Sequence, residues 1–352
     1  MDLPLLFALT AALCAVIYVL ADGFDLGVGI LFLFVPQDED RDLMMESIAP
    51  FWDGNETWLV AGGTLLLAAF PPGYYVLLPA FYSAIVPMLL ALILRGAAFE
   101  FRFHAGRLRR PWDWVFAVAS LVATFSQGLV LGGFIQGVRI RGGAFAGGTF
   151  DFVSLLGLFC ACGLIAGYCL LGAGWLVWKT TGSTQIFGRQ IAQAALIATM
   201  TMMALVSFWT AWTQPVIAVR WFDGSWYLAQ ALLPIAVGVT AITLHRCLWG
   251  RHDALPFALG LVIFLGGFGG LAFSLWPYLV PRQITIWQGA GDPATLRILG
   301  VGTVVILPLI VTYLSYAYWT FRGKIVSIVA RSDEAGIDRR LRDTPNEDFR
   351  IF

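Results

Sequence analysis

Residues 21–29 read Ala-Asp-Gly-Phe-Asp-Leu-Gly-Val-Gly, and they lie inside an apolar run that extends from residue 4 to residue 34. About 20 apolar residues are enough to cross a lipid bilayer as one helix. Asp22 and Asp25 share one face of this helix because they are three residues apart, and two glycines of the stretch have the spacing of a close helix–helix contact. Two carboxylates beside such a contact cannot both face lipid, so the stretch predicts a polar site inside a membrane protein.

The composition is that of a membrane protein. Of the 352 residues, 59% are hydrophobic and 12% are charged, whereas soluble domains carry about 25% charged residues. A soluble surface would need more charge, so lipid must cover much of this one. The 22 basic and 22 acidic residues cancel, and we therefore expect no nucleic acid as a partner.

Nine segments have the length and hydropathy of transmembrane helices. They are 4–34, 57–71, 74–103, 113–136, 153–178, 187–213, 226–249, 254–279 and 294–321. The second is short as an apolar run, and residues 46–56 are expected to extend it as a polar helical turn at the membrane face. We expect an all-α integral membrane protein, with one transmembrane domain of nine helices over residues 1–321 and a charged cytoplasmic tail over residues 322–352. Two groups of four helices with a peripheral ninth helix are the expected arrangement.

Lysine and arginine set the expected orientation. With nine spans, 17 basic residues fall on the side that holds the C-terminus and 5 fall on the other side. Cytoplasmic loops carry the excess of basic residues in membrane proteins. The N-terminus is therefore expected outside and the C-terminus in the cytoplasm.

Ionisable residues gather at three places towards the cytoplasmic side. Besides the two aspartates of the first span, Asp53 and Glu56 begin the second span, and Arg95 and Glu100 lie in the last turns of the third. Ionisable side chains at membrane depth are costly and usually serve a function. Carboxylates from three helices, with Arg95 as their charge partner, favour a path for protons. Helix capping and ion pairing by these acids is the other interpretation.

The histidines lie too near the span ends to hold a buried haem. A haem inside a membrane bundle needs axial ligands such as His within the spans, and His104, His245 and His252 all lie at cytoplasmic span ends. His104 and its neighbour Arg102 are expected to extend to the membrane surface. The sequence holds no motif for a metal site, a phosphate-binding loop or a catalytic nucleophile, so no catalytic residue is expected. If the protein takes part in redox chemistry, another chain must hold the metal.

Two long motifs, at 21–29 and 47–59, resemble subunit II of cytochrome bd-type quinol oxidases. The second motif reads Ser-Ile-Ala-Pro-Phe-Trp-Asp-Gly-Asn-Glu-Thr-Trp-Leu. The stretches Leu-Arg-Gly-Ala-Ala-Phe-Glu-Phe-Arg at 94–102 and Trp-Pro-Tyr-Leu-Val-Pro at 276–281 match less sharply, and order and spacing hold over nearly the whole chain. The Glu-Thr pair of the second motif is similar to the branch that includes cyanide-insensitive oxidases.

The resemblance implies a respiratory heterodimer in the bacterial inner membrane. In such a complex subunit I binds haem b and haem d and oxidises ubiquinol or menaquinol, while subunit II binds no haem. Oxygen is reduced to water with protons from the cytoplasm, which separates charge without a pump. A small single-span subunit and a structural quinone accompany some members. The family places acids of subunit II on the proton path. By motif these are Asp25 and Asp53, with Glu100 close by, and we add Asp22 and Glu56 from the same clusters.

Two other functions fit the intramembrane acids. One is a proton-coupled secondary transporter, although the sequence lacks broken helices in matched halves. The other is a scaffold that only stabilises subunit I and uses the acids as structural pairs. Haem absorption by the native complex would separate an oxidase from a transporter, and mutagenesis would separate a proton path from a scaffold.

Overall fold

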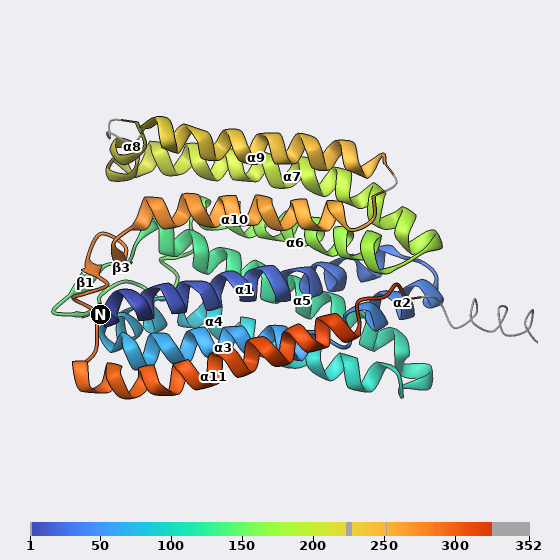
Figure 1. Ribbon diagram of the computed structural model, residues 1–352, viewed down its shortest axis with the longest axis horizontal. Coiled ribbons are helices and arrows are strands. Elements are labelled where there is room, and N and C mark those ends of the chain that lie inside the picture. The colour runs from blue at the N-terminus through green and yellow to red at the C-terminus, as the bar shows by residue number, and fades with distance from the viewer. Residues whose placement is uncertain (1, 223–226, 251, 326–352) are drawn as a thin grey trace, which may run out of the picture.

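Helices make up nearly all of the computed structural model, which describes residues 2–222, 227–250 and 252–325 (Figure 1). Nine of the helices in these ranges are long: α1 (Leu3–Leu31), α3 (Trp52–Ala69), α4 (Pro71–Arg102), α5 (Arg109–Gln136), α6 (Leu155–Lys179), α7 (Gly182–Thr213), α9 (Tyr227–Leu248), α10 (Leu255–Leu275) and α11 (Pro293–Thr320). Their order and approximate bounds agree with the nine predicted spans. The predicted all-α membrane architecture is therefore confirmed. Most of the predicted tail, residues 326–352, lies outside the described residues.

Polar caps determine where several of these helices begin. Asp2 accepts the backbone N–H of Leu5 at 3.1 Å at the start of α1, and Ser154 accepts that of Gly157 at 3.1 Å at the start of α6. Asp292 accepts two N–H groups of the first turn of α11, where a proline occupies the first position. Each cap satisfies donors that have no partner within the helix.

Two features near the second span depart from simple apolar helices. Eight described helices have the length and hydropathy of membrane spans by themselves. α3 falls short because Asp53, Asn55 and Glu56 make its first turns polar. The sequence did not predict α2 (Asp38–Ile48), which follows the short 3₁₀ helix η1 (Phe32–Phe34). Three acidic residues in its first turn favour a helix N-terminus there.

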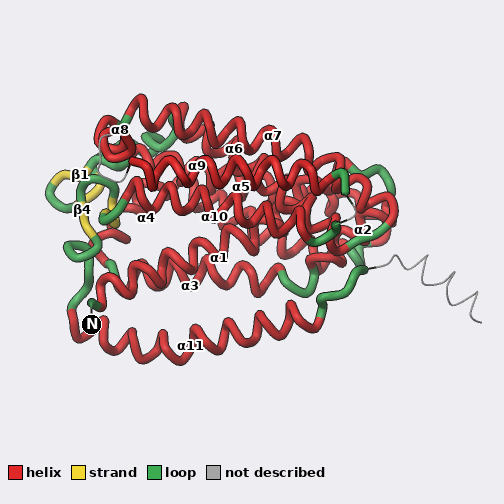
Figure 2. The backbone as a smooth tube through the Cα atoms, turned by 45° about the horizontal axis from the view of Figure 1, so that its top comes forward, coloured by secondary structure: helices red, strands yellow, loops and turns green. Residues whose placement is uncertain are grey.

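The long helices form two groups of four and one peripheral helix. In the first group α1, α3, α4 and α5 contact one another in a ring, and in the second group α6, α7, α9 and α10 do the same. The groups meet where α6 packs on α1 and α5. α11 lies outside both groups, beside α3 and α1 (Figure 1 and Figure 2). The predicted arrangement of four, four and one agrees with these contacts.

Close backbone contact between α1 and α6 joins the two groups. A Cβ atom on Gly27 would overlap the carbonyl oxygen of Tyr168, and a Cβ atom on Gly172 would overlap the backbone of Gly27 and Val28. Only glycine allows two helix backbones to approach so closely. The contact holds the first helix group against the second.

The two ends of the bundle carry different short elements. At the end that holds Asp2 lie α8 (Pro215–Phe222) and two small hairpins, β1 (Ile140–Arg141) with β2 (Ala144–Phe145) and β3 (Tyr278–Val280) with β4 (Ile284–Thr285). The opposite end, called here the α2 end, holds α2, the 3₁₀ helix η2 (Gly106–Leu108) and the last described residue, 325 (Figure 1). The first and last described residues thus lie at opposite ends, as an odd number of spans requires.

Candidate functional site

A cluster of buried charged residues lies in the half of the first helix group nearer the α2 end. Asp22 and Asp25 of α1 and Arg95 of α4 are each 0% exposed. Gly23 leaves room for the ring of Tyr168 beside the aspartates, since a Cβ there would lie 2.6 Å from that ring. The acids of α1 therefore face protein and not lipid.

Arg95 joins three helices through two ion pairs. Its Nη1 donates to Asp22 Oδ1 at 2.6 Å, and its Nη2 donates to Glu56 Oε2 at 3.0 Å. The side chain of Asp22 is fully buried, whereas that of Glu56 is 25% exposed. Charge-assisted hydrogen bonds from one guanidinium thus hold a carboxylate of α1 and a carboxylate of α3 in fixed positions.

Asp25 has an amide as its partner and no cation among the described residues. The side-chain nitrogen of Asn55 donates to Asp25 Oδ2 at 2.7 Å and to the carbonyl of Ala21 at 3.3 Å. The side-chain oxygen of Asn55 accepts from the hydroxyl of Tyr318, on α11, at 2.8 Å. Within the described part of the chain, Asp25 Oδ1 and Asp22 Oδ2 are buried and accept no hydrogen bond. Each aspartate therefore keeps one oxygen that is available to a proton or a water molecule.

Two tyrosines and a glutamine extend the polar cluster towards the middle of the bundle. Tyr18 precedes Asp22 by one turn of α1. Gln127 of α5 donates to the hydroxyl of Tyr18 at 2.7 Å, and Tyr168 of α6 donates to the side-chain oxygen of Gln127 at 2.8 Å. Sequence reasoning missed these three residues. One sequence signal could have identified Tyr18: it lies four residues before Asp22, and this spacing places both side chains on one face of the helix.

A groove between α3 and α4 reaches Glu56 from the side of the bundle. Its volume is about 330 Å³, and Asp53, Glu56 and Thr57 supply its polar lining. Gly96 and Ala97 of α4 are among the residues that line its other side. Asp53 is exposed and Glu56 is partly buried, so two acids one helical turn apart line the groove from its open side to its inner end.

Glu100 lies apart from this cluster. Its side chain is exposed on α4 and forms no ion pair with any described residue. Of the five acids predicted for a proton path, the structure brings Asp22, Asp25 and Glu56 together. It sets Asp53 in the groove and leaves Glu100 outside.

A second ion-pair cluster ties α2, α4 and α5 together at the α2 end. Arg102 is fully buried, and it donates from Nε to Asp113 Oδ1 at 2.5 Å and from Nη1 to Asp42 Oδ1 at 2.6 Å. Arg41 also pairs with Asp113, at 3.3 Å, and Arg109 pairs with Asp42. The expectation that Arg102 extends to the membrane surface is wrong, because two carboxylates neutralise its charge inside the protein.

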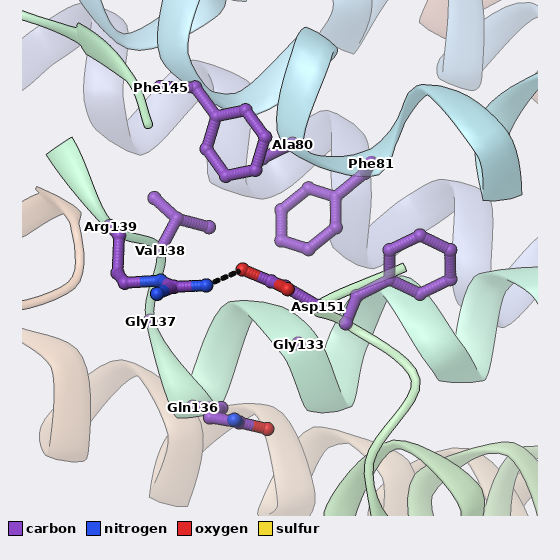
Figure 3. Close-up of a pocket in the computed structure, with 10 residues that line it drawn as sticks. Ala80, Phe81, Gly133, Gln136, Gly137, Val138, Arg139, Phe145 and Asp151 are labelled. Atoms are coloured by element: carbon purple, nitrogen blue, oxygen red, sulfur yellow. Dashed lines mark hydrogen bonds and ion pairs between the residues drawn. The ribbon is translucent and has the colours of Figure 1, made fainter. Parts of the chain in front are cut away.

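A separate cavity of about 420 Å³ lies at the other end of the bundle, beside the first hairpin (Figure 3). The rings of Phe81, Phe145 and Phe152 line it, together with the ion pair of Arg139 and Asp151 at 2.5 Å. The hydrogen bond from Arg139, supported by a backbone N–H, holds the pKa of Asp151 below its usual value. None of the residues predicted for the proton path lines this cavity.

Comparisons with known proteins agree with this architecture. The family described as cytochrome bd terminal oxidase subunit II matches residues 3–321. Cytochrome bd-I ubiquinol oxidase subunit 2 of Escherichia coli K12 is 27% identical over an alignment of 350 residues. The match covers 88% of this chain and 91% of the relative. Cytochrome bd ubiquinol oxidase subunit 2 of Bacillus subtilis is 26% identical over an alignment of 326 residues, and the match covers 86% of this chain and 91% of that relative.

A solved structure shares the fold. The bd oxidase from Geobacillus thermodenitrificans contains a chain that matches with a TM-score of 0.73 at 17% sequence identity, covering 91% of this chain and 99% of that one. The match to the family extends over nearly the whole transmembrane region. The chain therefore belongs to the cytochrome bd terminal oxidase subunit II family.

Proposed function

We propose that this chain is the haem-free second subunit of a quinol oxidase, and that it stabilises a haem-bearing subunit I and takes up protons for the reduction of oxygen. Its family makes it a component of a cytochrome bd oxidase of the respiratory chain. The relatives from E. coli and B. subtilis are ubiquinol oxidase subunits by name, and we assign quinol oxidation here to the partner subunit. The transporter alternative has no comparable support.

The environment of Asp25 carries the proton-uptake part of the proposal. Its carboxyl group is fully buried, and its polar partner among the described residues is the neutral amide of Asn55. Buried charge is costly unless a cation or several hydrogen bonds compensate it. An acid whose second oxygen accepts no hydrogen bond from the described protein is poorly explained as a structural pair. It suits a group that takes up and releases a proton.

The groove between α3 and α4 supplies an entry for protons. Asp53 lies on its open side and Glu56 at its inner end, where Glu56 meets Arg95 and Asp22. Arginine stays charged in proteins, so Arg95 holds the carboxylates in place and does not pass protons itself. Transfer from Glu56 to Asp25 therefore runs through the free carboxylate oxygens and bridging water.

The histidines of this chain do not fit a buried haem, which supports placing haem b and haem d in the partner subunit. His104, His245 and His252 are exposed near the α2 end. Axial ligands for a haem inside the bundle would have to lie within the spans. The haems supply electron transfer and oxygen chemistry, and the residues of this chain deliver protons to them.

We place the complex in the bacterial inner membrane, with the N-terminus in the periplasm and the C-terminus in the cytoplasm. The basic residues favour this orientation, and it turns the α2 end and the acid cluster towards the cytoplasm. The proposed domain of residues 1–321 is followed by a charged tail, 322–352. A small single-span subunit and a structural quinone stay predictions from the family resemblance.

Asp25→Asn and Asp53→Asn, in the complete oxidase complex, test the proposal. Asparagine keeps size and hydrogen bonding but cannot exchange a proton. Oxygen consumption driven by quinol should fall by about 100-fold in assembled Asp25→Asn, as expected when a proton-transfer group is lost. The loss should be smaller in Asp53→Asn, because water can bypass an exposed acid. Glu39→Gln, at an exposed acid of α2, is the control and should keep the parental rate.

Haem absorption of each purified complex separates the alternatives. Haem content should stay at the parental level while turnover falls. Activity that falls only in proportion to the amount of assembled complex would favour the scaffold interpretation. Parental turnover in both fully assembled variants would contradict a proton role.

A further inference from the structure

The outermost helix reaches the buried acid cluster through one side chain. α11 packs on α3 and α1, and only Leu296 and Leu314 are buried among its residues. Most of its other apolar residues are exposed. Near its end, however, the hydroxyl of Tyr318 points inward and donates to Asn55 at 2.8 Å.

The ring of Tyr318 is held firmly in this position. It stacks on Phe51, with ring centroids 4.4 Å apart and an interplanar angle of 19°, and its edge meets Trp175. Just beyond α11, the amine of Lys179 donates to the carbonyls of Phe321 and Gly323. The last turn of α11 is therefore fixed to the helix groups, although the rest of the helix lies at the periphery.

Three hydrogen bonds together fix which end of the Asn55 amide faces Asp25, and Tyr318 supplies the one on the side of the amide oxygen. An amide has an oxygen that accepts and a nitrogen that donates, and rotating the group exchanges them. With Tyr318 donating to the oxygen, the nitrogen points to Asp25 Oδ2, at 2.7 Å. Without the hydroxyl donor, only the two acceptors of the nitrogen, Asp25 and the carbonyl of Ala21, hold the amide in this orientation, and an amide that rotates gives Asp25 no hydrogen bond.

We propose that Tyr318 is a positioning residue for Asp25: it holds the oxygen of the Asn55 amide, whose nitrogen donates to Asp25 and Ala21, and so couples the packing of α11 to the proton-exchanging acid. The inference rests on the proposed function, in which Asp25 exchanges protons. It adds that α11 is part of the site, since the helix contributes the hydroxyl at the start of the chain Tyr318–Asn55–Asp25.

Tyr318→Phe in the complete complex tests the inference, with Tyr316→Phe as its matched control. Phenylalanine keeps the stacked ring and removes only the hydroxyl. Tyr316 lies two residues away on the same helix, is 63% exposed and donates no hydrogen bond to a described residue. With parental haem content, turnover of Tyr318→Phe should fall about fivefold, the factor that one hydrogen bond provides. Tyr316→Phe should match the parent.

Infrared spectra of the same complexes give a readout that a loss of packing would not produce. The carboxyl bands of Asp25 are those that disappear in Asp25→Asn. They should move in Tyr318→Phe, because the amide that donates to Asp25 loses the hydrogen bond on its oxygen, and they should stay in place in Tyr316→Phe. Identical Asp25 bands in the two tyrosine variants would overturn the role of Tyr318. Parental turnover of Asp25→Asn would instead overturn the proposed proton function, and the infrared comparison would still decide whether Tyr318 orients the partner of Asp25.

Discussion

Replacing Arg95 by glutamine removes the cation that two carboxylates share. Asp22 is 0% exposed and lies 2.6 Å from the guanidinium, whereas Glu56 is 25% exposed and lies at 3.0 Å. Breaking a buried ion pair by removing one partner costs about 3–5 kcal/mol, because the other charge is left buried. A partly exposed pair contributes at most about 1 kcal/mol. Arg95→Gln should therefore destabilise the protein by about 3–5 kcal/mol. Among single substitutions at Arg95, Asp22 and Glu56, Glu56→Gln should destabilise it least.

Removing both members of the buried pair should undo most of this loss. In Asp22→Asn combined with Arg95→Gln, two neutral amides replace the charges and can bond to each other. We expect the double variant to be more stable than Arg95→Gln alone by about 2–3 kcal/mol, within the range of couplings between residues in contact. The stability of Asp22→Asn alone should lie between those of the parent and Arg95→Gln, because Arg95 keeps Glu56 as a partner.

Denaturant unfolding of the purified complex, followed by tryptophan fluorescence, measures these differences at one fixed detergent concentration. Arg139→Gln is the control, because the side chains of Arg139 and Asp151, which form an ion pair, are 73% and 41% exposed. This variant should unfold at the parental midpoint. Either of two results would show that the pair of Asp22 and Arg95 does not stabilise the fold as argued. One is that Arg95→Gln unfolds at the same denaturant concentration as Arg139→Gln, and the other is that the double variant is no more stable than Arg95→Gln.

Three further predictions concern packing, helix anchoring and pH. Gly27→Ala should destabilise the assembled protein by about 1–3 kcal/mol through overpacking against α6, whereas Gly63→Ala, where a Cβ meets nothing within 4 Å, should not; equal yields of assembled complex would contradict this. Lys179→Met removes the donor to two carbonyls beyond α11 and should speed hydrogen exchange there, and unchanged exchange would exclude the anchor. The lowered pKa of Asp151 means that its pair with Arg139 stabilises the loop above the usual value of 3.8 and is lost as pH falls through the lowered pKa. The ratio of pepsin cleavage of that loop in the parent to its cleavage in Arg139→Gln should therefore rise with acidity, since the ratio cancels the pH dependence of pepsin itself, and a ratio that does not change with pH would refute the linkage.

The spans could be predicted because lipid imposes one requirement along the whole chain. Each apolar segment had to be long enough to cross the bilayer, and breakers such as Pro71-Pro72 separated one span from the next. α2 escaped prediction because its charged sequence, residues 38–48, is typical of a loop. Its buried face depends on tertiary contacts, which periodicity alone did not reveal.

The site could be predicted only where it is charged. Asp22, Asp25 and Arg95 stood out because ionisable residues are rare at membrane depth. Asn55 and Tyr318 did not stand out, since neutral polar residues occur in spans for many reasons, and their sequence separation hides that their hydrogen bond joins two neighbouring helices. Arg102 was misplaced for the opposite reason. Its position near a span end suggested the surface, and the carboxylates that bury it come from α2 and α5.

The second helix group covers one side of α1 with a largely uncharged surface. The described parts of α6, α7, α9 and α10 carry acidic or basic residues only within about two turns of their ends. The backbone of α6 at Gly172 packs on α1 at Gly27, whereas Asp22 and Asp25 bond to residues of α4 and α3. Within the described residues, this layer offers Asp25 no charged partner. The described access lies on the opposite side, at the groove of Asp53 and Glu56. In the proposed function, a proton that enters at this groove passes α3 and α4 before it reaches Asp25, so we place the proposed path in the first group, with α11 beside it and the second group as its largely uncharged cover.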